Sequence, residues 1–259
     1  MEASATVNSL AVLARSAART LVGASSSERS DAVREIAQAL RKHKARALAA
    51  NQEDMRTAKE SGMENSMLDR LLLTEERIES MARGAEKIAN LGDPLNRVIN
   101  ERTLPNGLEL RQVSVPFGVV GMVYEARPNV TVDAAVILLK SGNAALLRGS
   151  STAAKSNAAL VEIMREALAE THISPNVIQL VPSDDRETVR ALLTARGQID
   201  LVIPRGSAEL IRRVVDEATV PTIETGAGVC HVYVDEYADL SKALLILINS
   251  KTDRPSVCN

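Results

Sequence analysis

Short apolar runs alternate with longer, helix-like segments from Val119 onward, and this alternation limits the possible fold more than any other feature of the sequence. The run 119–124 is apolar enough to be buried on both faces, which is typical of a central parallel strand. Strands are predicted at 119–124, 144–148, 177–181, 199–203, 220–223 and 229–234, and helices at 132–140, 152–169, 187–196, 208–217 and 240–249. Such alternation, with right-handed crossovers, predicts a doubly wound, mostly parallel α/β sheet.

The first hundred residues show a different pattern, in which one-sided apolar stripes recur at helical spacing. Helices are predicted at 7–21, around 33–40, and after Thr74, which is a good N-cap followed by two glutamates. Because each stripe is one-sided, these helices must pack on another layer. We therefore predict an N-terminal helical layer over residues 1–100 and a strand at 108–115, after Asn106-Gly107.

Charge and composition argue against several classes of protein. Lysine plus arginine number 31 and aspartate plus glutamate 33, so no field of one sign favours nucleic acid or an anionic membrane. The few aromatic residues leave no stacking platform for single-stranded nucleic acid. No segment reaches the length of a membrane span, and residues 1–21 lack the apolar core and cleavage site of a signal peptide. We expect a cytoplasmic protein without a nucleic-acid or membrane partner.

Small and cationic residues follow the predicted strands at their carboxyl ends, the edge where ligands bind in such sheets. The loops are Glu125-Ala126-Arg127-Pro128-Asn129, Arg148-Gly149-Ser150-Ser151, Pro204-Arg205-Gly206-Ser207 and Thr225-Gly226-Ala227-Gly228. Glycines and hydroxyls at helix starts leave backbone N–H groups that can hold a phosphate. Each loop alone fits ordinary turn and capping chemistry, but their concentration on one edge indicates a nucleotide. The usual Gly-x-Gly-x-x-Gly fingerprint is absent.

The two cysteines of the chain differ in their surroundings. Cys230 and His231 lie in an apolar alternating run, which predicts packed strand residues. Cys258 follows an apolar helix in a polar loop with Lys251 and Arg254, and nearby cations favour the reactive thiolate form of cysteine. A nucleophilic cysteine and a merely solvated terminal cysteine both fit this pattern. The cysteines form no metal-ligand pattern, so we predict no metal site.

Several longer motifs resemble one known family. They are PFGVVGMVYEARPNVT at 116–131, KSGNA at 140–144, LRG at 147–149, CHVYVD at 230–235 and DRPSVCN at 253–259. Together they resemble the gamma-glutamyl phosphate reductases of the aldehyde dehydrogenase superfamily, over nearly the whole chain. The resemblance implies an atypical Rossmann cofactor domain, which would explain the absent fingerprint. It also implies NADPH-dependent reduction of L-glutamyl 5-phosphate to L-glutamate 5-semialdehyde and phosphate, a step of proline biosynthesis.

The resemblance also assigns cofactor-binding residues. Arg148 stands near the adenosine ribose, where its charge would favour the 2′-phosphate of NADPH, and Gly149 and Ser150 follow it. Gly206 and Ser207 stand in the turn that lies under the pyrophosphate. An NADP-binding α/β domain is therefore expected over residues 101–250.

For the chemistry itself, the resemblance makes Cys258 the nucleophile whose thiolate forms a thioester with the acyl group. On chemical grounds, Arg127, Asn129 and Arg254 are candidates for holding the oxyanion and the substrate phosphate. Glu224 matches a water-activating glutamate of hydrolytic relatives, a role that this reaction does not need.

One departure from the family concerns length. Its members continue well beyond the nucleophile, whereas this chain ends one residue after it, so residues 251–259 would be only the start of the catalytic domain. The chain by itself is then expected to be inactive. Two alternatives stay open: a non-catalytic nucleotide-binding or assembly fragment, and an aldehyde dehydrogenase relative acting on another acyl group. The resemblance further implies a homo-oligomer for the longer form and a transient partner, glutamate 5-kinase.

Overall fold

The computed structural model describes residues 2–223 and 229–253. The chain divides into two compact units, Met1–Glu224 and Thr225–Asn259. The larger unit contains the sheet and the helices that cover it, and the smaller one contains helix α10 (Leu240–Thr252).

Four parallel strands form the sheet of the larger unit, in the order β5-β4-β3-β6. Their bounds are Val119–Tyr124 for β3, Ala144–Arg148 for β4, Ile178–Leu180 for β5 and Leu201–Arg205 for β6. The chain adds β4 and β5 on one side of β3 and then crosses to place β6 on the other side. The predicted parallel α/β sheet is thus confirmed. The reversal of strand order between β3 and β6 marks the place where ligands bind in sheets of this class.

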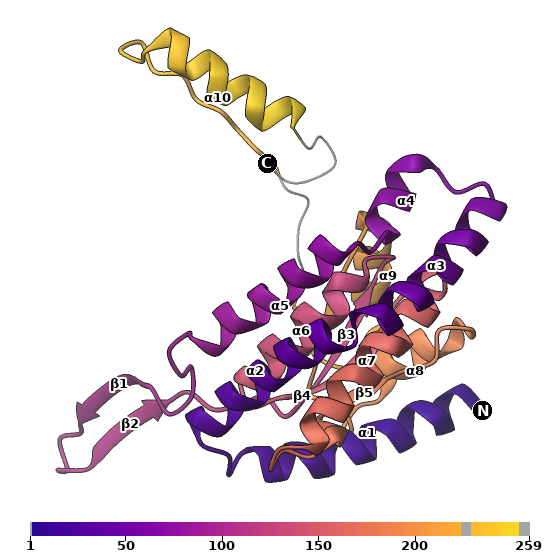
Figure 1. The fold of residues 1–259 in the computed structure, drawn as a ribbon. Helices are drawn as coiled ribbons and strands as arrows, with labels where there is room; N and C mark the ends of the chain where they lie inside the picture. The colour runs from indigo at the N-terminus through magenta and orange to yellow at the C-terminus, as the bar shows by residue number, and fades with distance from the viewer. Residues whose placement is uncertain (1, 224–228, 254–259) are drawn as a thin grey trace. The chain divides into compact units, whose positions relative to one another are not determined.

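Helices cover both faces of this sheet (Figure 1). α6 (Pro128–Lys140) and α7 (Ala154–Ala169) connect β3 to β4 and β4 to β5, and they pack against each other. α8 (Glu187–Thr194) returns the chain to β6 and contacts both α1 (Glu2–Leu21) and α9 (Ala208–Glu217). Because right-handed crossovers that progress in opposite directions place their helices on opposite faces, α8 lies across the sheet from α6 and α7. Short 3₁₀ turns, Ser151–Ala153 and Pro175–Val177, flank α7.

A second helical layer packs on α6 and α7, as the one-sided stripes predict. α2 (Ser26–Lys42) contacts α5 (Glu75–Ala89), α6 and α7, while α3 (Lys44–Glu60) contacts α7 and α4 (Asn65–Leu71). Ser25 begins α2 with a capping box, and the predicted N-cap Thr74 accepts a hydrogen bond from the Arg77 backbone N–H at 3.2 Å. One apolar core joins α2, α3 and α5 to the sheet, and a smaller cluster joins Leu71 of α4 to Ala58 and Ala153. The predicted domain boundaries near residues 100 and 250 stay a prediction.

The sequence did not predict α3 or α4. The buried positions of α3 are Ala47, Asn51, Asp54 and Ala58, so half of its inward face is polar. An apolar stripe at helical spacing is the signal for a packed helix, and α3 lacks one. Its packing instead uses hydrogen bonds that the Asn51 amide donates and that the Asp54 carboxylate accepts.

An antiparallel hairpin precedes the sheet. β1 (Val98–Thr103) pairs with β2 (Glu109–Val113), and Gly107 takes a positive φ of 85° in the turn between them. The strand predicted after Asn106-Gly107 is therefore confirmed, whereas its partner β1 was not predicted. Every residue of both strands is exposed.

Two predicted strands, 220–223 and 229–234, are wrong. The first forms only an isolated bridge between Thr222 and Val202, and residues 229–234 have no strand structure. A strand needs a neighbour for its backbone hydrogen bonds, and the described residues provide none for 229–234. Consequently Cys230 and His231 are exposed, not packed in a strand as predicted.

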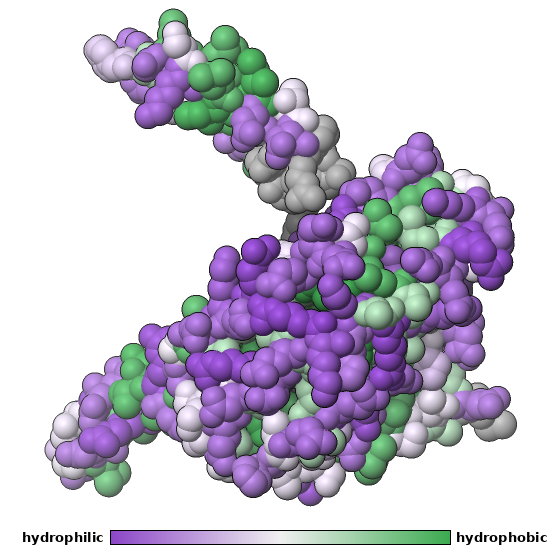
Figure 2. Space-filling model, viewed as in Figure 1, coloured by the Kyte–Doolittle hydropathy of each residue, from purple (hydrophilic) through white to green (hydrophobic). Residues whose placement is uncertain are grey.

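Helix α10 confirms the helix predicted at 240–249, but none of its described residues is buried. Its exposed side chains include Leu240, Leu244, Leu245 and Ile246, and Figure 2 shows apolar side chains gathered on this helix. Among the described residues, no helix is both long and apolar enough to cross a membrane.

Candidate active site

Three of the loops singled out in the sequence meet at the carboxyl edge of β3, β4 and β6. The register places Val123 of β3 beside Arg148, the last residue of β4, and Tyr124 beside Arg205, the last residue of β6. The residues that follow these strand ends therefore emerge side by side. The fourth predicted loop, 225–228, lies outside the described residues.

The amino terminus of α9 lies at the reversal of strand order and is built from two of these loops. Ser207 is its N-cap, and its hydroxyl accepts a hydrogen bond from the Leu210 N–H at 3.4 Å. The Ser207 backbone N–H points the other way, donating to the Glu125 carboxylate at 2.7 Å. A Cβ at Gly206 would lie 2.6 Å from the Glu125 carboxyl carbon, so glycine leaves the space that this carboxylate fills.

Arg148 is buried beneath the same edge, where its guanidinium binds the loop that leads to α8. It donates to the carbonyls of Gly149 at 2.9 Å, Asp185 at 3.3 Å and Ser183 at 3.4 Å, and to the Thr188 hydroxyl at 3.5 Å. Burial lowers the pKa of Arg148, and the neighbouring charge of Arg213 lowers it further. In this arrangement most of its donors are already used within the chain, so its predicted contact with a ribose phosphate stays a prediction.

Gly149 is held by a buried polar chain that the sequence analysis missed. Tyr124 and Thr131 share a hydroxyl hydrogen bond of 2.7 Å, and Thr131 donates to the Asn157 amide oxygen at 2.8 Å. A Cβ at Gly149 would lie 2.3 Å from the Asn157 amide nitrogen, so the turn packs directly on this chain. Burial raises the pKa of Tyr124 far above its usual range, which keeps its hydroxyl protonated.

The amino terminus of α7 is occupied by Asp54 of α3. Its carboxylate accepts from the Ser156 N–H at 2.7 Å, the Ser156 hydroxyl at 2.6 Å and the Lys155 N–H at 3.3 Å. Nearby, the predicted site residue Ser150 accepts from the Thr152 N–H at 3.3 Å. Both contacts are capping interactions, and they make the α7 end a structural joint between the sheet and the helical layer. Asp54 lies in a polar segment with no motif, so nothing in the sequence marked it.

The predicted oxyanion and substrate-phosphate candidates begin α6. Arg127 is the N-cap residue, partly buried, and it precedes Pro128 at the first helical position. Asn129 is exposed, and its amide donates to the Asp133 carboxylate at 3.0 Å. Burial raises the pKa of Asp133, against the lowering effect of that hydrogen bond. The other predicted residues, Arg254 and Cys258, lie outside the described residues.

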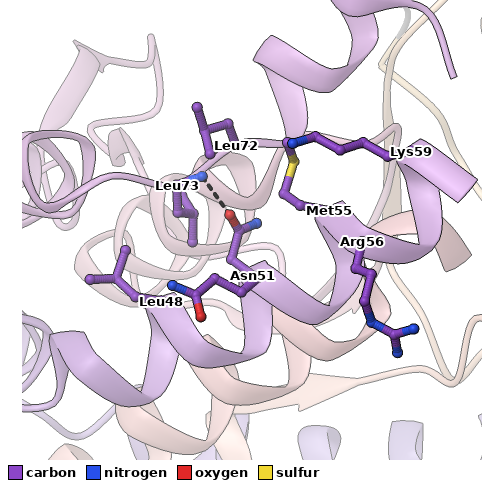
Figure 3. A pocket seen from close by; sticks show the side chains of 8 residues that line it. Leu48, Asn51, Met55, Arg56, Lys59, Leu72 and Leu73 are labelled. Atoms are coloured by element: carbon purple, nitrogen blue, oxygen red, sulfur yellow. Dashed lines mark hydrogen bonds between the residues drawn. The ribbon is translucent and has the colours of Figure 1, made fainter.

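A separate hollow of about 430 Å³ lies over α3 in the helical layer (Figure 3). Its apolar lining includes Leu48 and Leu72, and Arg56 and Lys59 extend along the same helix. Asn51 uses both of its amide N–H donors within the protein: it donates to the Leu71 carbonyl and the Ser156 hydroxyl, and it accepts from the Leu73 N–H at 2.7 Å. Asn51 therefore offers the hollow no amide N–H that lacks a partner.

The comparisons with known proteins identify the family of the chain. The sequence model of the aldehyde dehydrogenase family matches residues 2–254. The chain belongs to the aldehyde dehydrogenase family. It is 52% identical, over 253 residues, to the gamma-glutamyl phosphate reductase of Thermobifida fusca, covering 98% of this chain and 60% of that protein.

Solved structures of family members show the same fold. The gamma-glutamyl phosphate reductase of Thermotoga maritima superposes with a TM-score of 0.90 at 42% identity, over 97% of this chain and 61% of the other. The reductase of Saccharomyces cerevisiae superposes with a TM-score of 0.77 at 35% identity, over 95% of this chain and 62% of the other. This family member thus spans about three-fifths of the length of its matched relatives.

Membership of this family implies a nicotinamide cofactor, and the edge between β3 and β6 fits one. An anion, the Glu125 carboxylate, already sits on the Ser207 N–H in the position where the first turn of a helix attracts phosphate. Because Gly206 has no side chain, a pyrophosphate can approach the backbone closely there. Among the described residues, no group of three or more His, Cys, Asp or Glu side chains could hold a metal ion.

Proposed function

We propose that this chain is the cofactor-binding part of an NADPH-dependent gamma-glutamyl phosphate reductase, an enzyme that converts L-glutamyl 5-phosphate to L-glutamate 5-semialdehyde and phosphate. The observation that carries the proposal is 52% identity to a protein of that name over 98% of the chain. The anion-accepting end of α9, at the reversal of strand order, supports it from the geometry.

In the proposed reaction, the Cys258 thiolate attacks the acyl carbon of the substrate. The carbon–sulfur bond forms as the carbon–oxygen bond to phosphate breaks, and inorganic phosphate leaves. NADPH, when bound, would supply the hydride that converts the thioester to the aldehyde and releases the Cys258 thiolate. Arg127 and Arg254 would receive the departing phosphate, because guanidinium groups match phosphate oxygens in geometry and charge.

The cofactor residues have separate tasks in this proposal. The Ser207 N–H and the space beside Gly206 would receive the pyrophosphate, and Gly149 and Ser150 would border the adenosine ribose. Arg148 would favour NADPH over NADH by binding the 2′-phosphate. For this, its guanidinium would give up one of its long hydrogen bonds, such as the 3.4 Å bond to the Ser183 carbonyl. Asn129 would aid the oxyanion by the same kind of exchange with Asp133.

A second candidate function follows from length. Because the chain spans 60% of the Thermobifida fusca protein, it can also act as a nucleotide-binding or assembly part without catalysis of its own. We expect no turnover by this chain alone, since catalysis needs the acyl carbon held about 3 to 3.5 Å from the nucleophile by a complete site. A cytoplasmic location, a homo-oligomeric longer form and transient contact with glutamate 5-kinase remain parts of the proposal.

The test joins this chain to the remaining part of the Thermobifida fusca relative and measures NADPH formation from the semialdehyde, phosphate and NADP. Cys258→Ser should abolish the reaction, because an alcohol is a far poorer nucleophile than a thiolate at neutral pH. Cys230→Ser is the matched control, because Cys230 is exposed and lies in the same unit of the chain. Activity that survives Cys258→Ser but not Cys230→Ser would refute the assignment.

A further inference from the structure

The Glu125 carboxylate occupies a backbone donor of the proposed pyrophosphate site. It accepts from the N–H of Ser207, the N-cap residue of α9, at 2.7 Å, although the two residues lie 82 positions apart. Its side-chain atoms fill the space above Gly206, where an added Cβ would lie within 2.6 to 2.8 Å of three of them. A single carboxylate thus provides both the charge and the volume of a bound anion.

We propose that Glu125 is an internal competitor for the dinucleotide: its carboxylate binds the end of α9 in the nucleotide-free chain and must leave before a phosphate can bind there. The inference rests on the proposed function, because it assumes that the pyrophosphate uses this helix end. Two anions cannot share one N–H donor, and their mutual repulsion at contact distance would oppose joint occupancy.

The backbone around Glu125 is fixed, so the exchange involves the side chain alone. The Glu125 N–H donates to the Arg205 carbonyl at 3.2 Å, and the Glu125 carbonyl accepts from the Arg127 N–H at 2.7 Å. These bonds hold the loop to the end of β6 while the rotatable bonds of the side chain remain available for movement. The side chain is only partly buried, which allows the carboxylate to turn into solvent without passing through the core.

This arrangement has a measurable consequence for affinity. When only a fraction of molecules have the helix end open, the apparent dissociation constant exceeds the intrinsic one by the inverse of that fraction. Phosphate-bearing ligands such as NADP and ADP would be affected, because they need the Ser207 N–H. Adenosine, which carries no phosphate, would not be affected.

The experiment measures NADP, ADP and adenosine binding to the 259-residue chain by isothermal titration calorimetry, for the unchanged protein and three variants. Glu125→Gln keeps the side-chain shape and removes the charge, whereas Glu125→Asp keeps the charge and shortens the reach. Glu209→Gln is the matched control, because Glu209 is an exposed acidic residue in the first turn of the same helix. Thermal unfolding followed by circular dichroism verifies that each variant is folded.

We expect Glu125→Gln and Glu125→Asp to bind NADP and ADP about tenfold more tightly, which corresponds to an open fraction of about one-tenth in the unchanged chain. Adenosine binding should stay within twofold, as should every affinity of Glu209→Gln. Equal or weaker NADP binding by both Glu125 variants would overturn the inference and leave the proposed function standing. If the unchanged chain and all variants fail to bind NADP, the proposed function fails, and the inference fails with it.

Discussion

Replacement of Arg148 by alanine separates a structural role from a role in cofactor choice. The side chain is 8% exposed, and its guanidinium donates to three backbone carbonyls and one hydroxyl. Through these bonds it holds the end of β4 to the loop that begins α8. Removal of the side chain therefore takes away the loop's anchor and leaves the Gly149 carbonyl buried without this donor.

The expected loss of unfolding free energy follows from the lengths of these hydrogen bonds. The 2.9 Å bond to Gly149 is a charge-assisted hydrogen bond, worth about 1.5 to 3 kcal/mol. The other three, at 3.3 to 3.5 Å, are long, and the carbonyls of Ser183 and Asp185 can be hydrated once the arginine is gone. We therefore expect Arg148→Ala to lower the free energy of unfolding by about 3 kcal/mol, with relief of the buried charge offsetting part of the loss.

Urea unfolding followed by circular dichroism measures this loss, and Arg186→Ala is the control because Arg186 is an exposed arginine at the start of α8. The control should change the free energy of unfolding by less than about 0.5 kcal/mol. NADPH affinity should fall tenfold or more further than NADH affinity in Arg148→Ala, because the proposed contact with the 2′-phosphate is lost together with the loop's anchor. An unchanged unfolding midpoint would refute the structural role of Arg148, and equal losses of NADPH and NADH affinity would remove its guanidinium from the proposed 2′-phosphate site.

Two further predictions concern the joints between the sheet and the helical layer. Asp54→Ala should lower the free energy of unfolding by about 2 to 4 kcal/mol and speed hydrogen exchange at the start of α7, because the buried carboxylate accepts three hydrogen bonds there. Asp54→Asn should cost less. Equal exchange rates in the unchanged protein and both variants would contradict the capping role. Burial lowers the pKa of Lys140, so the unfolded chain binds the lysine proton more tightly than the folded chain. The free energy of unfolding, measured relative to Lys140→Met, should therefore rise as pH increases toward 10.5. A difference in unfolding free energy that stays constant between pH 7 and 10.5 would contradict this prediction.

The sheet was predictable because its strands are short apolar runs between clear breaks. The predicted strand 144–148 and helix 208–217 match the structure residue for residue. α3 was missed because two of its buried residues are Asn51 and Asp54, whose burial depends on partners elsewhere in the chain. The strand prediction for 229–234 was wrong although the apolar residues alternate as in a strand, because a strand also needs a neighbouring strand that local sequence cannot reveal.

The candidate site was predictable only in part. The loops at the carboxyl edge were identified because parallel strands must end together, and the register of β3 with β4 and β6 brings them to one place. The partners of their side chains were not predictable. Arg148 is buried and binds the loop before α8, and Glu125 binds a residue 82 positions away, contacts that only tertiary structure defines.

The most direct test of the central claim, that the β3–β6 edge binds a nicotinamide dinucleotide, is a titration of the ¹⁵N-labelled, deuterated chain with NADP followed by amide chemical shifts. Saturable shifts should appear first at Gly206 and Ser207, at the start of α9, while amides of the α3 hollow, such as that of Met55, stay in place. The absence of any shift at the start of α9, or saturable shifts confined to the α3 hollow, would contradict the account.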